Sequence, residues 1–577
     1  MNTNQKSPQA KRLARQQALA LDRRRLLTLP PEKALTLVAD HPYPVTLVQS
    51  MAAEDFYFLV HAIGTEDSRP ILALASNEQW EYLLDMETWQ RDHLAPHEMT
   101  LWLERLLKAD PDRFTHWITN AKRDEFALYL FKNIELHIRE YDQDPAEIGD
   151  GFFSEDQTYY IRMLPCPGEQ PQTQERRDQF LTDMLKRVSI YDLDRYRNLL
   201  LSSTSIIPAE AEEEGYRLRN VRLAEKGFLP FEEALGVYQP LSVSALLKRK
   251  QKARARKGRI VDTYPLPVEL QQPKADANRF ARTLARIGDS HSRQILQTEF
   301  AALCNQVIVA DQKQIREKEA LRQIVRKVGD YISIGLEKVA ATAETPAPHG
   351  DAELVQKHPL ADIFRVGYGC CLELKWKAER WRHGSWFANT GLPISFWGEK
   401  WMGVLGGLLI KKPLYYDNYE SGVLYREFAL LTDIEKTRNE LGQIIAFDDL
   451  LSLIDVDPGP ALTHGLLTYQ NLIMTVWANH YLGTAVRADR LVPLTASQFR
   501  DLFDALWEQA NPPRRISRAM REIFLGWLAD CCGLTDFEIA ERMAPALEAM
   551  FAQIESELGQ VSAEDIETRY VQQFIIK

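Results

Sequence analysis

A short unit recurs along residues 26–140 of the chain, and this repetition restricts the fold more than any other feature. In each copy a small, polar or proline residue precedes an acidic residue, and an apolar run follows. An acidic residue in the first turn stabilises a helix because it complements the helix dipole. Each unit predicts one helix of about two or three turns, too short to bury its apolar face without a neighbour. We predict a superhelix of short stacked helices, whose first turns contain Glu32, Glu54, Glu66, Glu78, Glu98, Asp112 and Asp124.

Helix-capping signals support this interpretation and extend it to the far end of the chain. A Ser or Thr followed three residues later by Glu or Gln is typical of a capping box at a helix start. Proline directly after an Asp is typical of the first helical position. The capping pairs are Ser76 with Gln79, Thr495 with Gln498, and Thr535 with Glu538, and Asp110 precedes Pro111. Gly533 is expected to end the helix before the last of them.

The second half of the chain has a clear helical period and almost no alternating strand pattern. Apolar residues recur from Leu321 to Val339 at helical spacing, and residues 341–358 have the composition of a surface loop. We therefore predict an all-α protein, with an N-terminal superhelix of short stacked helices and a larger irregular helical C-terminal domain. The predicted parts are a basic helix or tail (1–25), the superhelix (26–165), a helical continuation (166–247), a basic linker (248–262) and the C-terminal domain (263–577).

Two sets of segments resemble known families. The runs LLTLPPEKALTLV, AAEDFYFLVHAIG and ILALASNEQWEYLL resemble the N-terminal superhelical domain of MgtE-type magnesium transporters. The runs ALASNEQWEYLLDMETW and RLRNVRLAEKGFLPFEEALGVYQPL are similar to an uncharacterised bacterial family known only as a domain of unknown function. Both resemblances imply a helical fold, and the second implies no activity.

Charge, cysteine content and hydropathy indicate a cytoplasmic protein. The formal net charge is −11, and none of the six cysteines forms a CxxC motif, which is typical of a reducing compartment. The first residues contain no apolar run of the kind found in secretory signals. The longest apolar run, Met402 to Ile410, is far shorter than the ~20 residues of a membrane-spanning helix. We expect no membrane span.

A basic run, KRKQKARARKGR, occupies residues 248–259. It is interpreted as a solvated linker or, alternatively, as an arm that contacts phosphate groups. The run lacks interleaved aromatic residues for base stacking, and an acidic chain repels nucleic acid at long range, so nucleic acid is not the expected partner. The candidate basic residues are Lys248, Arg249, Lys250, Arg254, Arg256 and Lys257.

Five of the twelve tryptophans lie between residues 376 and 401, inside an aromatic-rich segment at 368–420. This segment is either the aromatic core of the C-terminal half or the wall of a ligand pocket or protein interface. The candidate ligand or interface residues are Trp381, His383, Trp386, Trp397, Trp401, Lys411 and Lys412.

No motif in the chain predicts a catalytic residue, a metal ligand or a cofactor. The run from Gly288 to His291 is interpreted as a helix break, because an amphipathic helix rather than a strand precedes its serine. The glycines at 403, 406 and 407 do not form a phosphate-binding loop and indicate close helix packing. Asp455, Asp457 and His464 match an ordinary turn, and no EF-hand glutamate follows them. The adjacent pairs Cys370–Cys371 and Cys531–Cys532 are expected in helical cores.

These observations favour a helical interaction, scaffold or regulatory protein with an unknown protein partner. One alternative is an enzyme or small-molecule sensor with a pocket at 376–420. A weaker alternative is association with nucleic acid through the basic segments. The sequence leaves the oligomeric state open.

Overall fold

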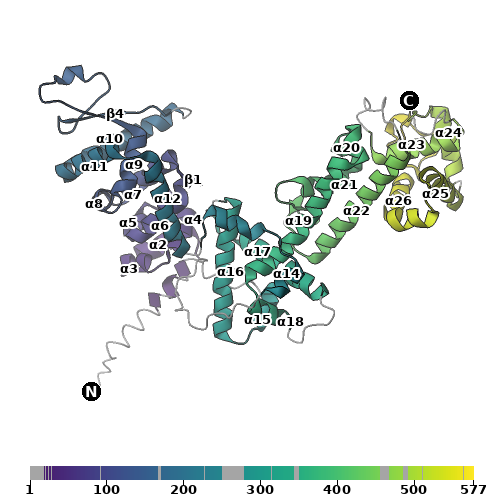
Figure 1. Ribbon diagram of the computed structural model, residues 1–577, viewed down its shortest axis with the longest axis horizontal. Helices are drawn as coiled ribbons and strands as arrows, with labels where there is room; N and C mark the ends of the chain where they lie inside the picture. Colours follow the sequence, from purple (N-terminus) through teal and green to yellow (C-terminus); the bar gives the residue numbers. More distant parts are fainter. Residues whose placement is uncertain are drawn as a thin grey trace. The chain divides into compact units, whose positions relative to one another are not determined.

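The computed structural model describes residues 18–577, apart from 20, 24, 27–28, 91, 167–169, 226–227, 250–277, 314, 343–349, 455, 457–466, 485–490, 510 and 563–564. Helices dominate these residues, and the sheets among them are three two-stranded antiparallel pairs. The predicted all-α class is therefore confirmed. The chain divides into two compact units (Figure 1): Met1–Gln239, Ala245–Ile332 and Ala343–Arg365 in the first, and Pro240–Ser244, Ser333–Thr342 and Val366–Lys577 in the second.

The first unit contains eight short helices between residues 31 and 133, and six of them begin with the predicted acidic first turn. The prediction was wrong for the other two, because α3 has no acidic residue in its first turn and Glu66 lies before α5 rather than inside it. Each of the eight packs against the next helix along the chain or the next but one, as short amphipathic helices must. Ser76 forms the predicted capping box with Gln79, and Asp110 caps the helix that starts at Pro111. These helices are α2 (Pro31–Ala39), α3 (Pro44–Gln49), α4 (Ala53–Ile63), α5 (Arg69–Leu74), α6 (Asn77–Glu87), α7 (Pro96–Ala109), α8 (Pro111–Asn120) and α9 (Arg123–Asn133).

The first unit also contains two hairpins. The strands β1 (Trp89–Gln90) and β2 (His93–Leu94) form a tight pair after α6. The strands β3 (Ile134–Ile138) and β4 (Tyr159–Met163) pair with Leu136 opposite the buried Ile161. The sequence does not reveal this second hairpin, because a long loop over residues 139–158 separates two strands of only five residues each.

Further helices complete the first unit, and one of them corrects a prediction. The helix α18 (Gly350–Lys357) lies within the predicted loop 341–358. Its Asp351 forms an ion pair at 2.7 Å with Arg279, and only Val355 of the helix is fully buried. The sequence does not reveal α18, because its helix is mostly polar and is held by an ion pair with a residue far away in the sequence. The other helices are α10 (Pro171–Tyr191), α11 (Leu193–Ser205), α12 (Pro208–Glu225), α13 (Phe231–Ala234), α14 (Val243–Lys248), α15 (Arg279–Arg286), α16 (Ser290–Asp311) and α17 (Lys318–Thr342), some of which continue into the second unit.

The second unit is built around α22 (Leu431–Ile454), which runs alongside α21 (Gly398–Leu409) in Figure 1. The predicted capping boxes at Thr495 and Thr535 are present, and Gly533 ends its helix in the left-handed conformation with φ 62°. The remaining elements are α19 (Leu360–Gly384), α20 (Trp386–Thr390), the hairpin of β5 (Tyr415–Tyr416) and β6 (Tyr425–Arg426), α23 (Tyr469–Tyr481), α24 (Ala496–Leu506), α25 (Arg518–Cys532) and α26 (Asp536–Leu558).

The glycines of α21 allow a close approach, but the partner is the β5–β6 hairpin rather than another helix. A Cβ atom at Gly403 would lie 2.4 Å from the ring of Tyr416, and one at Gly407 would lie 2.5 Å from the carbonyl oxygen of Leu414. The predicted close packing is therefore present, but the prediction that a second helix would be the partner was wrong. Among the described residues, no helix combines the length and apolar character needed to cross a bilayer.

Candidate ligand-binding groove of the second unit

The structure separates the seven aromatic and basic candidates of the segment 368–420. Trp397 and Trp401 are buried and line a cavity, whereas Trp381 is buried in the core and Trp386 is half-buried. His383 and Lys411 are exposed and Lys412 is half-buried, and none of these three lines the cavity. The segment is thus partly core and partly pocket wall, so each of the two interpretations describes part of it.

A cluster of packed aromatic rings adjoins the cavity and includes Trp397, which also lines it. The rings of Trp381 and Phe387 are stacked with centroids 5.8 Å apart, and Trp397 contacts both. The carboxylate of Asp448 accepts backbone hydrogen bonds from Trp386 at 3.2 Å and Phe387 at 2.9 Å. Burial raises the pKa of Asp448, although these hydrogen bonds oppose the shift. The buried acid therefore holds the short helix α20 in place through its N-terminal amides.

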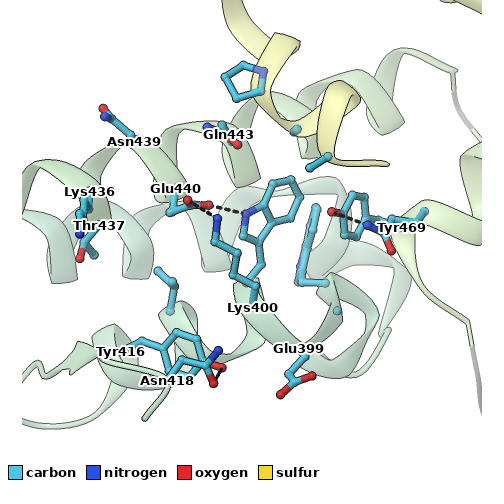
Figure 2. A pocket seen from close by; sticks show the side chains of 18 of the residues that line it. Glu399, Lys400, Tyr416, Asn418, Lys436, Thr437, Asn439, Glu440, Gln443 and Tyr469 are labelled. Carbon is cyan, nitrogen blue, oxygen red and sulfur yellow. Dashed lines mark hydrogen bonds and ion pairs between the residues drawn. The ribbon is translucent and has the colours of Figure 1, made fainter. Parts of the chain in front are cut away.

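The cavity has a volume of about 730 Å³, and Trp401 forms part of its wall. The indole stacks on Tyr469 with centroids 4.5 Å apart and an interplanar angle of 20°. The indole Nε1–H donates to Glu440 Oε2 at 2.8 Å, and Lys400 Nζ lies 2.5 Å from Glu440 Oε1 (Figure 2). Burial raises the pKa of Tyr469. One carboxylate thus orients both a lysine and a tryptophan at the pocket wall.

Arg426 holds the hairpin wall of the cavity. Its guanidinium binds Asp417 at 2.6 Å and Asp433 at 2.8 Å and lies over the ring of Tyr415. Burial opposes the ionisation of Asp417, but hydrogen bonds from Ser421 and Arg426 outweigh it and lower the pKa of that carboxyl. Two carboxylates and a ring around one arginine make the β5–β6 hairpin a firmly held wall.

A second depression of about 520 Å³ continues the cavity along α22. The two share Asn439, Gln443 and Pro545 in their linings, so they adjoin each other between α22 and α26, and together they are here called the α22 groove. From Lys436 to Leu453 it follows α22 for about 25 Å at the helical rise of ~1.5 Å per residue. Its far end combines the charged residues Asp449, Glu541 and Arg542 with a set of apolar ones, which are Ile445, Ala446, Leu450, Leu453, Leu534 and Met543.

Pro545 lies inside α26 at the point where the two depressions meet. A proline has no N–H, so the carbonyl one turn before it, that of Glu541, lacks its usual helical donor. Sequence reasoning missed Pro545, Glu440, Gln443 and Tyr469, since all lie far along the chain from the tryptophan-rich segment. Of these four residues, only Pro545 gave a signal in the sequence, because it is a proline within an otherwise helical pattern.

The other candidates of the sequence do not gather into a second site. Asp289 caps α16, which confirms the predicted helix break. Arg249 pairs with Asp362 at 2.6 Å and Lys248 ends α14, whereas Lys250, Arg254, Arg256 and Lys257 lie outside the described residues. Asp455, Asp457 and His464 also lie outside them. Within the part of the chain that the structure describes, no three His, Cys, Asp or Glu residues are grouped as a metal site would require.

The fold and groove define the chain as an all-α protein with an elongated, partly aromatic groove. The model of DUF6178, a family of unknown function, matches residues 11–577, so the chain belongs to this family. This confirms the expected membership of an uncharacterised family. No curated protein matches the chain, and no solved structure does. The resemblance of the N-terminal segments to MgtE-type transporters is not confirmed by these comparisons.

Proposed function

We propose that this chain is an interaction protein that binds an extended segment of a partner protein in the α22 groove. The observation that carries the proposal is that the two depressions adjoin along α22 and share three lining residues. Their combined space exceeds what a compact small ligand fills, since such sites hold about 300–1,000 Å³. A length of about 25 Å accommodates roughly seven extended residues at ~3.3 Å each.

The lining of the groove suggests the chemistry of the bound segment. Its far end, around Leu450, Leu453 and Met543, suits apolar side chains. At the other end, the carboxylates of Glu399 and Glu420 and the ring of Tyr416 suit a basic side chain. The segment is therefore expected to carry apolar residues followed or preceded by Lys or Arg.

The described lining residues of the larger cavity favour binding over chemistry. They include no His, Cys or Ser, and the carboxylates of Glu440 and Asp417 are engaged by Lys400 and Arg426. The other two carboxylates of the lining are Glu399 and Glu420. General acid–base and nucleophilic catalysis rely on such groups held ready to exchange a proton or attack. Paired carboxylates serve better to orient neighbours than to abstract protons.

A random-peptide display library selected on the full chain tests the proposal. Asn439→Arg places a long cation between the two depressions, and Ser452→Arg makes the same change on α22 at an exposed position outside both linings. We expect enriched peptides with the stated chemistry that bind the wild type and Ser452→Arg but lose at least tenfold in affinity toward Asn439→Arg. Absence of enrichment, or equal binding to both variants, would overturn the proposal.

The volume of the larger cavity, about 730 Å³, favours one second candidate, a small polar molecule held between Trp401, Tyr416 and Gln443. A ligand-observed NMR screen of small polar compounds decides between the two. Saturable binding that Asn439→Arg weakens, together with failure of the peptide selection, would favour the small molecule.

A further inference from the structure

A separate pocket lies in the first unit, among α6, α12, α13 and α16. Its volume is about 290 Å³, and its walls include the aromatic rings of Trp89, Tyr216, Phe228 and Phe231. Gly215 makes room for Trp89, because a Cβ atom there would lie 3.2 Å from the indole. A cavity of roughly 150 Å³ takes a benzene ring, so this pocket has room for a ring and a short chain.

Among the described residues that line the pocket there are two cations, Arg219 and Lys313, and no carboxylate. Arg219 shares one face of α12 with Tyr216 and Leu223, and Lys313 follows the end of α16 at the exposed rim. The Nε–H of Arg219 donates to the backbone carbonyl of Asp85 at 2.7 Å. The carboxylate of Asp85 is held instead by Arg222, at 2.8 and 2.7 Å.

These contacts leave the pocket with the character of an anion site inside an aromatic enclosure. The hydrogen bond from Arg219 to the carbonyl of Asp85 uses the Nε–H, whereas the terminal nitrogens of a guanidinium form the fork that binds a carboxylate. Burial lowers the pKa of Arg219, as expected for a cation in surroundings that disfavour its charge. A bound anion would relieve that cost while the rings cover the ligand's apolar body.

We propose that this pocket binds a small organic carboxylate with an aromatic ring or short alkyl chain, with Arg219 and Lys313 holding the carboxylate. The pocket belongs to the first unit, so the proposal does not depend on the α22 groove.

Calorimetric titration of the full chain with 3-phenylpropionate, and with its neutral isostere 3-phenylpropionamide, tests the proposal. We expect saturable binding of the acid at least about tenfold tighter than that of the amide, since charge-assisted hydrogen bonds are the stronger ones. Arg219→Met should remove the preference for the acid. Arg217→Met is the matched control, because Arg217 is exposed on the same helix and pairs with Glu214.

Equal affinity for acid and amide, absence of binding, or a preference retained in Arg219→Met would each overturn the proposal. If Arg219→Met does not fold, Lys313→Met decides, because Lys313 is exposed at the rim and its removal leaves the core intact. A severalfold loss of affinity for the acid, with none for the amide, supports the site. Unchanged affinity for the acid overturns it.

Discussion

Arg222 binds both carboxylate oxygens of Asp85, at 2.8 and 2.7 Å, across 137 residues of sequence. The carboxylate is buried with a side-chain exposure of 5%, and burial raises its pKa although Arg222 opposes the shift. This pair attaches α12 to α6 and so joins the first short helices to the longer ones.

Arg222→Met should lower the free energy of unfolding by about 3 kcal/mol, because it leaves a buried carboxylate without its partner. Urea denaturation of the full chain measures the loss. The control is Arg217→Met, which removes an ion pair with both partners more than half exposed and should change stability by less than ~0.5 kcal/mol. Equal effects of the two substitutions would contradict the role assigned to the pair.

Glu87 should make stability depend on pH in the acid range. Burial opposes its ionisation, but hydrogen bonds from His61 and Tyr57 and the charge of Arg316 lower its pKa from 4.5 to about 2. A carboxyl with a lowered folded-state pKa contributes stability above its unfolded pKa and loses it as pH falls toward the folded value. The contribution is about 3 kcal/mol at neutral pH.

Urea titrations of wild type and Glu87→Gln at a series of pH values measure this contribution. The difference in stability should be constant above about pH 5 and shrink steadily as the pH falls toward 2. Glu66→Gln serves as a control, because Glu66 is 68% exposed in its pair with Arg105. A difference between wild type and Glu87→Gln that stays constant down to pH 3 would disprove the assignment.

Trp401→Ala should destabilise the second unit by about 3–5 kcal/mol, since it removes a buried ring from a packed core. Trp401→Phe keeps a ring against Tyr469 and loses the hydrogen bond to Glu440, so a smaller loss of about 1–2 kcal/mol is expected. Trp376→Ala, at a tryptophan 44% exposed on α19, is the matched control. Chemical denaturation followed by circular dichroism ranks the three variants, and a loss at Trp376 as large as at Trp401 would contradict the packing described.

Two glycine substitutions should change stability in opposite directions. Gly403→Ala places a Cβ atom 2.4 Å from the ring of Tyr416 and should cost about 1–3 kcal/mol through overpacking. Gly442→Ala, within α22, meets nothing within 4 Å and should stabilise by about 0.5–1 kcal/mol because alanine favours the helix. Thermal unfolding of both variants measures the signs. The same sign for both would refute the close contact between α21 and the hairpin.

Local sequence patterns determine much of the helical architecture without any information about tertiary contacts. The acidic first turns predicted six of the eight helices from α2 to α9, all but α3 and α5. The capping boxes at Ser76, Thr495 and Thr535 placed three helix starts, because these signals act within one turn of the backbone. The polar helix α18 escaped prediction, since its ion pair with Arg279 is made by tertiary contact. The tryptophan-rich segment indicated where to look for a site without saying which rings face a cavity.

The sequence by itself determined the helical class, the helix starts and the aromatic segment that contains Trp397 and Trp401. Only the tertiary structure decided that Glu440, Tyr469 and Pro545 meet these rings in one groove, and that Arg219 faces an aromatic pocket. The physical reason is the sequence separation over which each kind of interaction acts. Capping and helical periodicity arise from residues within a turn or two of each other, whereas a binding site is formed by side chains that packing brings together from distant helices.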